Sequence, residues 1–276
     1  MSTNIDPIGV FDSGVGGLSV LRAMCKQMPN ESMIYFGDQG HVPYGSRSME
    51  EIQKFSEGIT RFLLNKNSKL IVVACNTASA AALTYLRKRF PDVSFVGMEP
   101  AVKPAAEITK TGKVGVLATP ATFQGALYAS VVERFGAGVE LFQHTCPGLV
   151  SQIENGELDS PKTRAILEDA LLPMLEKNID TVVLGCTHYP FVIPLIQQIV
   201  GDNVRVIDPA PSVARQANRL LEASGMLNHA DKAARVEFFT SADSISMKSL
   251  LPLLLGTNGN VQRVTWTEGY KVINSP

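Results

Sequence analysis

The feature that most constrains the fold is a regular alternation of short buried segments, rich in β-branched residues, with longer amphipathic segments. The clearest amphipathic segment begins at Ser48, where S-x-x-E through Glu51 predicts a capping box, and another begins at Ser160, directly before a proline. Strands that alternate with helices form parallel sheets covered by helices on both faces. Eight segments are predicted to be strands: residues 8–11, 33–36, 70–74, 93–96, 114–117, 139–142, 181–184 and 204–207.

This pattern occurs twice along the chain. The strand at 8–11 runs into the turn DSGVGG and the strand at 114–117 into ATPATF, while the strands LIVVA and TVVLG end in Cys75 and Cys186. Both pairs occur in the same order and are separated by similar lengths of chain. The repeat indicates two related α/β halves rather than one continuous sheet.

Prolines mark the places where the chain is expected to cross between these halves. We expect one domain of residues 1–98 and 208–276 and a second of residues 99–207, each with one of the two strand-end cysteines. After residue 208 the sequence predicts one more strand and one more helix, which are too few for a third domain. We expect both to pack on the first domain. The last residues, from about Trp266, are expected to form a tail.

Composition and charge argue against several classes of protein. Hydrophobic residues make up 45% of the 276 residues and charged residues 18%, which is enough apolar surface for a folded core. The net charge of -1 and the lack of a basic block argue against binding to nucleic acid or to an anionic membrane. The first residues lack the pattern of a secretory signal, and the longest apolar stretch is far shorter than the roughly 20 residues that span a bilayer. We therefore expect a cytoplasmic protein.

The four cysteines, Cys25, Cys75, Cys146 and Cys186, are too few and too scattered for a disulfide scaffold, and none forms a C-x-x-C pair. Cys75 and Cys186 each follow a buried strand, at the edge of a parallel sheet where ligands bind, and each is expected to open onto a helix. The N-terminus of a helix lowers the pKa of a thiol, so these two thiols are predicted to be reactive. Cys25 and Cys146 are predicted to be structural.

Two further polar residues lie near these strand ends. Asp12 follows the strand at 8–11, and His188 lies two residues after Cys186. The glycine-rich run after Asp12 has Ser19 where a dinucleotide loop requires glycine, and no P-loop motif occurs. The glycines are therefore expected to let the backbone approach a small ligand. Neither a cofactor nor a metal is expected.

Four strings of the sequence carry a resemblance to a known family. IGVFDSGVGGLSVL, YFGDQGHVPYG, VVACNTASA and VVLGCTHYP occur in this order, and together they resemble the glutamate racemases of the aspartate/glutamate racemase superfamily. The resemblance covers almost the whole chain and implies two pseudo-symmetric α/β domains with the active site in the cleft between them. It also implies cofactor-independent conversion between L-glutamate and D-glutamate, which supplies D-glutamate for peptidoglycan, by a homodimer.

The resemblance assigns roles residue by residue. Cys75 in ACNTAS and Cys186 in GCTHYP match the two catalytic cysteines, which transfer the α-proton. The residues that match groups assisting proton transfer are Asp12, His188, Asp38 and, in the looser motif LVSQIENG, Glu154. The residues that match substrate-binding positions are Asp12, Ser13, Pro43, Tyr44, Gly45, Asn76, Thr77, Thr119, Thr122, Thr187 and His188. Around Thr119 the string ATPATFQG departs from the more glycine-rich string of the family.

Racemisation removes a proton from one face of the α-carbon and delivers one to the other, which suits two thiols on opposite walls. Such a carbon acid is very weak without a cofactor, so the site is expected to exclude water and to hold preorganised donors. Three alternatives remain open: a racemase for aspartate or another small amino acid, a non-enzymatic amino-acid-binding protein, and a thiol-disulfide exchanger. A cysteine variant that binds substrate without turnover would separate the enzyme from the binding protein.

Overall fold

The computed structural model describes residues 3–99, 101–136, 138–230 and 234–274. The chain forms two compact units, unit 1 of Met1–Met98 with Ala210–Pro276 and unit 2 of Glu99–Pro209. Asp208 and Pro209 therefore belong to unit 2 and not, as expected, to the first domain. The reason is that the chain leaves unit 2 only where helix α10 (Ala210–Ala223) begins, two residues beyond the strand end.

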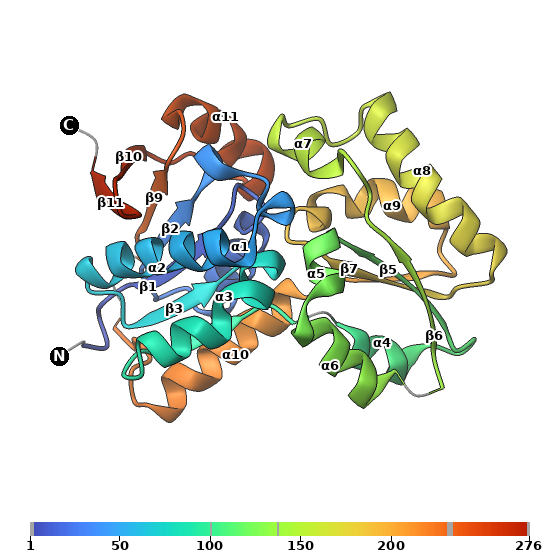
Figure 1. Cartoon of the computed structure of the whole chain (residues 1–276), viewed down its shortest axis with the longest axis horizontal. Coiled ribbons are helices and arrows are strands. Elements are labelled where there is room, and N and C mark those ends of the chain that lie inside the picture. The colour runs from blue at the N-terminus through green and yellow to red at the C-terminus, as the bar shows by residue number, and fades with distance from the viewer. Residues whose placement is uncertain (1–2, 100, 137, 231–233, 275–276) are drawn as a thin grey trace. The chain divides into compact units, whose positions relative to one another are not determined.

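Unit 1 is built on a seven-stranded sheet in the order β11-β10-β9-β2-β1-β3-β4 (Figure 1). All neighbouring strands pair in parallel except β10 and β11, which are antiparallel. The chain moves from β1 to β2 on one side and later to β3 on the other, so the strand order reverses between β1 and β3. The strands are β1 (Ile8–Asp12), β2 (Met33–Gly37), β3 (Leu70–Val73), β4 (Phe95–Gly97), β9 (Val236–Thr240), β10 (Val261–Thr267) and β11 (Lys271–Asn274).

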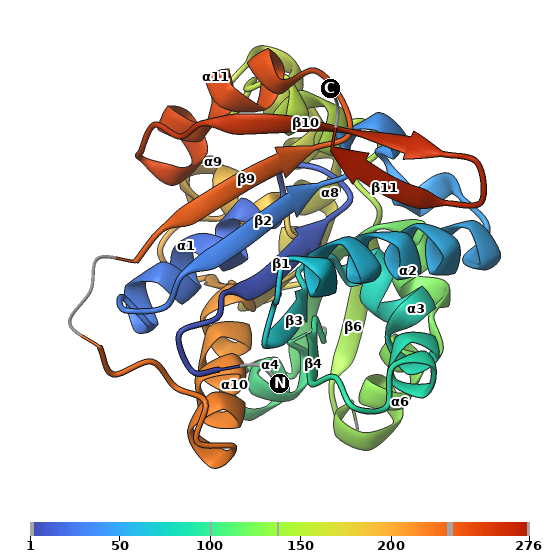
Figure 2. The ribbon, with the colours of Figure 1, turned by 90° about the vertical axis from the view of Figure 1, so that its left-hand side faces the viewer.

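Helices cover both faces of this sheet. Helices α2 (Met49–Asn65) and α3 (Asn76–Arg89) pack together on one face, and α1 (Leu18–Gln27) packs against α10 and α11 (Ser244–Leu255) on the other (Figure 2). The capping box at the start of α2 is confirmed, because Ser48 Oγ accepts from the Glu51 N–H at 3.3 Å and Glu51 Oε2 accepts from the Ser48 N–H at 3.1 Å. All residues of β1, β2 and β3 are buried, as expected of strands covered on both faces.

The predicted C-terminal tail is wrong. Residues 261–274 form the β10–β11 hairpin, which extends the sheet beyond β9, and Trp266 is part of β10. Only Val261 and Val264 of β10 are buried. The sequence therefore lacks the regular apolar alternation that would predict a strand here. The hairpin packs on α2 at Gly58, where a Cβ atom would lie 2.6 Å from the Trp266 ring. Glycine is therefore required at that point of α2.

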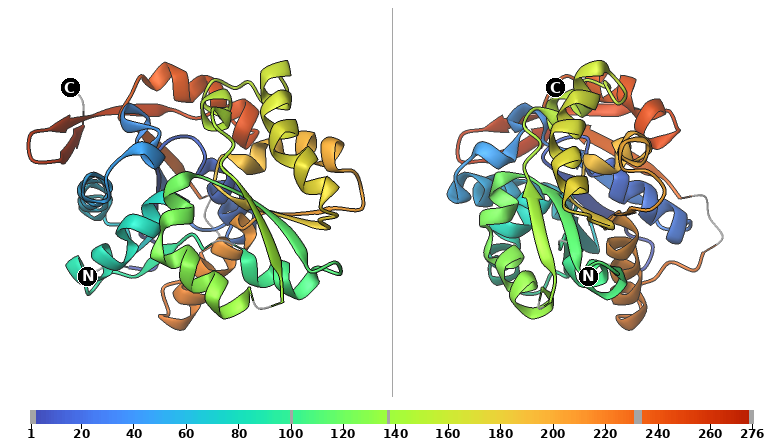
Figure 3. Two further views of the ribbon diagram at one scale, coloured as in Figure 1. Left: turned by 45° about the vertical axis from the view of Figure 1, so that its right-hand side comes forward. Right: turned by 90° about the vertical axis from the view of Figure 1, so that its right-hand side faces the viewer.

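Unit 2 is built on a four-stranded parallel sheet in the order β6-β5-β7-β8. Helices α8 and α9 cover one face and α4 and α6 the other, as Figure 3 shows from two directions. The strands are β5 (Lys113–Ala118), β6 (Glu140–His144), β7 (Thr181–Gly185) and β8 (Arg205–Ile207). The helices are α4 (Val102–Ile108), α5 (Pro120–Gln124), α6 (Ala126–Phe135), α7 (Leu149–Glu154), α8 (Pro161–Glu176) and α9 (Ile193–Val200).

The two sheets share one connectivity. In unit 2 the chain moves from β5 to β6 on one side and then to β7 on the other, as it moves from β1 to β2 and then to β3 in unit 1. The predicted fold class, two related α/β halves built on parallel sheets, is confirmed. Within the described part of the chain, no helix is both long and apolar enough to cross a membrane.

A buried ion pair gives a prediction about the stability of unit 1. Lys69 Nζ lies 2.6 Å from Glu31 Oε2, with side chains 0% and 1% exposed, and the ammonium also donates to the carbonyls of Asn4 and Met226. Replacing Lys69 with methionine leaves a buried carboxylate without a counter-charge, so we expect the free energy of unfolding to fall by about 3–5 kcal/mol. Urea unfolding followed by circular dichroism measures this change.

The matched control is the exposed pair between Arg61 and Glu57, whose side chains are 46% and 19% exposed. Arg61→Met is expected to change the free energy of unfolding by about 0–1 kcal/mol, because water screens the pair and Arg89 still contacts Glu57. Equal losses in the two variants would contradict the prediction.

Candidate active site

In unit 1, the neighbouring strands β1 and β3 end at the same edge of the sheet, and polar residues lie at both ends. Because β1 and β3 are parallel and adjacent, Asp12 at the end of β1 and Ser13 directly after it come close to Cys75 after β3. Cys75 is 4% exposed and occupies the N-cap of α3, where its Sγ accepts from the Ala78 N–H at 3.4 Å. The same Sγ lies 3.7 Å from Ser13 Oγ. This is the point at which the strand order reverses, the usual ligand position in an open parallel sheet.

The pKa of the Cys75 thiol is raised, whereas its place at a helix N-terminus predicts a lowered pKa. Burial raises it well above its ordinary value, and the negative charge of Asp12 raises it further. Hydrogen bonds from the Ala78 N–H and from Ser13 lower it, as expected for a helix N-terminus, but they are the smaller contributions. Burial beside Asp12 therefore favours the protonated form of the Cys75 thiol.

The glycine-rich run after β1 folds around the Asp12 carboxylate. Asp12 is 0% exposed, and its Oδ2 accepts from the N–H groups of Gly14 at 3.2 Å and Gly17 at 2.9 Å. A Cβ atom at Gly17 would lie 2.7 Å from Asp12 Cβ, so only glycine allows this close approach. The run therefore positions Asp12, and with it the negative charge that acts on Cys75.

The PYG segment lies in the loop that follows β2. Tyr44 is buried at 1% exposure and donates its hydroxyl proton to Asp38 Oδ2 at 2.6 Å. Burial raises the pKa of Tyr44 well above its ordinary value, and the charge of Asp38 and the hydrogen bond to it raise this pKa further. Pro43 is exposed and Gly45 is partly exposed, and both are next to Tyr44 in the chain. The loop therefore places one buried ring near Cys75.

Asn76 and Thr77, the first two residues of α3, are each 4% exposed. Among the described residues, neither Asn76 Oδ1 nor Asn76 Nδ2 has a hydrogen-bond partner. A buried amide without partners is costly, so a hydrogen bond to this side chain would be favourable. The Asn76 side chain next to Cys75 is thus available to a small polar ligand.

In unit 2, Cys186, His188 and Glu154 form a connected chain of three groups. Cys186 directly follows β7 and is 5% exposed, and its Sγ lies 3.8 Å from His188 Nδ1. His188 Nε2 lies 2.6 Å from Glu154 Oε1 at the end of α7. Burial opposes a charge on His188, but hydrogen bonds to Cys186 and Glu154, with the charges of both, raise its pKa well above the ordinary value. The imidazole is therefore held protonated beside the thiol.

The segment after Cys186 differs from the expected helix. A short 3-10 helix, η3 (Tyr189–Val192), comes first, and α9 begins only at Ile193, because Pro190 falls in this turn. Cys186 therefore has no α-helix N-terminus directly behind it, unlike Cys75. In unit 2 the His188 side chain lies beside the thiol instead.

The three threonines of unit 2 that match substrate-binding positions lie near the same sheet edge. Ala118 of β5 pairs with Gly185 of β7, which brings Thr119 next to Cys186 in the register of the sheet. Thr119 Oγ1 and Thr122 Oγ1 are 3.0 Å apart, and Thr122 is 2% exposed. Thr187 is 2% exposed. Apart from Glu154 and Thr122, which lie in α7 and α5, the predicted residues of unit 2 thus directly follow the ends of two adjacent strands.

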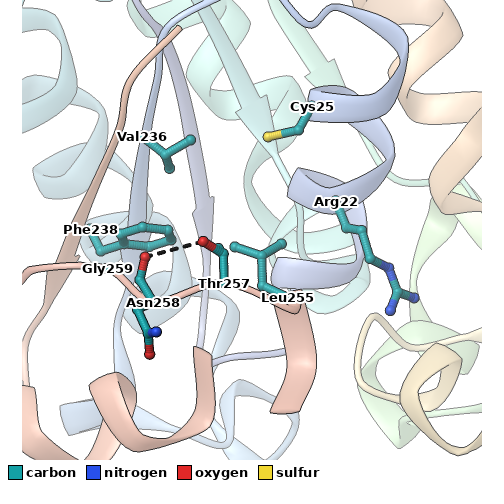
Figure 4. A pocket seen from close by; sticks show the side chains of 8 residues that line it. All are labelled: Arg22, Cys25, Val236, Phe238, Leu255, Thr257, Asn258 and Gly259. Atoms are coloured by element: carbon teal, nitrogen blue, oxygen red, sulfur yellow. Dashed lines mark hydrogen bonds between the residues drawn. The ribbon is translucent and has the colours of Figure 1, made fainter. Parts of the chain in front are cut away.

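Of the other two cysteines, Cys146 is more deeply buried than Cys75 and Cys186, and Cys25 lies elsewhere in unit 1. Burial, followed by the charges of Cys186 and Asp169, raises the pKa of Cys146 to about 12, so this thiol stays protonated. Cys25 is only partly buried and faces a cavity of about 310 Å³ on unit 1 (Figure 4). That cavity is lined by Arg22, Cys25, Val236, Phe238, Leu255, Thr257, Asn258 and Gly259. Among the described residues, no group of three or more His, Cys, Asp or Glu side chains could hold a metal ion.

Comparison with known proteins identifies the family of the chain. Residues 8–217 match the family described as Asp/Glu/Hydantoin racemase. The glutamate racemase of Pseudomonas aeruginosa strain UCBPP-PA14 is 48% identical over 96% of this chain and 99% of its own length. The crystal structure of RacE1, a glutamate racemase of Bacillus anthracis, has a TM-score of 0.83 and 36% identity over 94% of this chain and 97% of its own. That of the Francisella tularensis glutamate racemase, in complex with D-glutamate, has a TM-score of 0.82 and 31% identity over 95% and 98% of the two chains. This chain therefore belongs to the Asp/Glu/Hydantoin racemase family.

Proposed function

We propose that this chain interconverts L-glutamate and D-glutamate by proton transfer between Cys75, Cys186 and the substrate α-carbon. The observation that carries the proposal is that two buried thiols occupy equivalent strand ends of two sheets with one connectivity. Relatives named glutamate racemase, 48% identical over nearly the whole chain, support glutamate as the substrate, as does the Francisella tularensis complex with D-glutamate.

In the proposed reaction one thiol acts on each face of the substrate α-carbon. A Cys186 thiolate takes the α-proton of L-glutamate and becomes a thiol, and the Cys75 thiol gives its proton to the opposite face and becomes a thiolate. D-Glutamate reacts in the reverse sense, with Cys75 as the base. Each turnover moves one proton off the substrate and one onto it, so no oxidant, reductant or cofactor is required.

The neighbours of the thiols have distinct roles in this proposal. His188, held protonated by Glu154, stabilises the Cys186 thiolate, because an imidazolium beside a thiolate favours the ionised form. Asp12 raises the pKa of Cys75 in the ligand-free protein. A substrate ammonium group beside Asp12 would offset that negative charge and lower the pKa of the thiol. Substrate binding itself would then prepare Cys75 to act as the base.

The remaining polar groups are proposed to hold the substrate. Asn76 offers an unpartnered buried amide, and the α3 N-terminus offers N–H groups that suit a carboxylate. The other proposed substrate contacts are Ser13, Pro43, Tyr44, Gly45, Thr77, Thr119, Thr122 and Thr187. We further propose a cytoplasmic homodimer that supplies D-glutamate for peptidoglycan.

One assay tests the proposal. Purified protein is incubated with L-glutamate in deuterated water, without added cofactor, and circular dichroism is followed together with loss of the α-proton signal. The expected result is loss of optical activity and replacement of the α-proton by deuterium. Parallel samples with L-aspartate test the closest alternative substrate. Activity on aspartate but not on glutamate, or activity that needs an added metal, would defeat the proposal.

A further inference from the structure

A buried carboxylate joins three separate parts of unit 1. Asp38 directly follows β2 and is 0% exposed. Its Oδ1 accepts hydrogen bonds from Trp266 Nε1 at 2.9 Å and from Ser241 Oγ at 2.5 Å, and its Oδ2 accepts from the Tyr44 hydroxyl at 2.6 Å. His41 Nδ1 lies 2.9 Å from one carboxylate oxygen and 3.1 Å from the other. Four side chains therefore meet on one carboxylate.

These four side chains come from distant parts of the sequence. His41 and Tyr44 belong to the loop that follows Asp38, Ser241 belongs to the turn after β9, and Trp266 belongs to the C-terminal hairpin. The Ser241 hydroxyl also accepts from the Gly40 N–H of the loop at 2.9 Å. The loop is thus attached to two segments that the sequence motifs do not include.

The Trp266 side chain is itself held in place by α2. Its ring meets the rings of Phe55 and His41 edge-on, at centroid distances of 5.5 and 5.4 Å. Gly58 allows the close approach of the helix to the indole ring. Because packing fixes the ring, the indole N–H points at Asp38 without further loss of freedom.

We infer that Trp266 is a positioning residue for the proposed racemisation, acting through Asp38 on the loop of Tyr44. Tyr44 has its hydroxyl bound to Asp38 and its ring in the same core cluster as Cys75. The donor from Trp266 helps to satisfy the buried charge of Asp38, and Asp38 in turn fixes Tyr44 and the neighbouring backbone of Pro43 and Gly45. This inference rests on the proposed function, in which that loop holds the substrate. In this inference Asp38 acts as a positioning residue, because both its carboxylate oxygens accept hydrogen bonds from side chains of unit 1.

The test compares two aromatic residues of the same hairpin. Trp266→Phe keeps a ring but removes the N–H, and we expect KM for both glutamate enantiomers to rise about fivefold, since a displaced loop weakens substrate binding. Tyr270→Phe is the matched control, because Tyr270 packs on Phe55 without donating to Asp38, and its KM is expected to equal that of the wild type. A purely structural role would lower the amount of active enzyme and leave KM unchanged.

The outcomes are distinguishable. If the wild type turns over glutamate and Trp266→Phe has the wild-type KM, the inference alone is overturned. If the wild type is inactive on glutamate, the proposed function fails and the inference fails with it. If Trp266→Phe does not fold, Ser241→Ala removes another donor to the same Asp38 oxygen and must raise KM in the same way. An unchanged KM in that variant also overturns the inference.

Fluorescence gives a readout that needs no turnover. Trp266 is the only tryptophan of the chain, so its emission reports on this contact. Saturating D-glutamate is expected to change the emission of the wild type, and Tyr44→Phe, which separates the loop from Asp38, is expected to weaken that change. Emission that responds equally in both proteins contradicts a connection through Asp38.

Discussion

Replacing Cys75 or Cys186 with alanine is expected to lower kcat for racemisation by about 10³-fold or more in both directions. In the proposed mechanism each thiol is the proton donor for one face of the α-carbon, and a positioned acid or base contributes about 10²–10⁴-fold. Circular dichroism at saturating glutamate measures the loss. Cys25→Ala is the matched control, because Cys25 lines a separate cavity of unit 1, and this variant is expected to keep wild-type activity.

The same variants test which thiol acts on which enantiomer. The two enantiomers have equal free energy, so kcat/KM must fall equally in both directions, and steady-state rates cannot separate the roles. Exchange of the α-proton with solvent can separate the roles of the two thiols, because exchange needs only one base. Cys186→Ala is expected to exchange the α-proton of D-glutamate but not that of L-glutamate, and Cys75→Ala the reverse. Two variants with near wild-type racemisation would contradict the two-thiol mechanism.

Replacing Glu154 with glutamine is expected to lower kcat/KM by about 10²-fold at alkaline pH and by less at lower pH. The Glu154 carboxylate accepts from His188 at 2.6 Å and is one of the groups that raise the pKa of that imidazole. Without this negative charge the pKa of His188 falls, so the imidazolium is lost at a lower pH and the Cys186 thiolate loses its counter-charge. The alkaline limb of the pH profile is therefore expected to move toward lower pH.

The control for Glu154 is Glu157→Gln, an exposed glutamate three residues further along the chain. This change removes a similar charge that does not contact His188, and the pH profile is expected to match that of the wild type. A Glu154→Gln profile that falls uniformly at every pH, with no movement of its alkaline limb, would contradict the role assigned to the carboxylate.

Much of the fold can be predicted from the sequence because it depends on local pattern. All eight predicted strands are present, since each is a short apolar run bounded by turn residues. The placement of Cys75 and Ser13 side by side also follows, because parallel neighbouring strands end at the same edge. The β10–β11 hairpin could not be predicted, because most of β10 is exposed and its residues show no strong apolar alternation.

The electrostatics of the site depend on tertiary contacts and were less predictable. The helix N-terminus at Cys75 suggests a lowered pKa, but burial and the proximity of Asp12, which come from the three-dimensional packing, reverse the result. Glu154 lies in a loose motif, yet α7 brings it within 2.6 Å of His188. No motif marks Trp266 as a partner of Asp38, because the two residues meet only in the folded sheet.

The discontinuity of unit 1 has a consequence for the nascent chain. Unit 2 is a continuous stretch, so all its strands have left the ribosome before β9 and β10, which complete the sheet of unit 1. At about 5–20 residues per second, synthesis of the stretch between β4 and β9 takes on the order of ten seconds. During that time the edge of β2 lacks its neighbour, and Asp38 lacks two of its four donors. Cys75 and Cys186 are therefore translated well before Trp266, and the loop of Tyr44 gains its last attachment only when synthesis is almost finished.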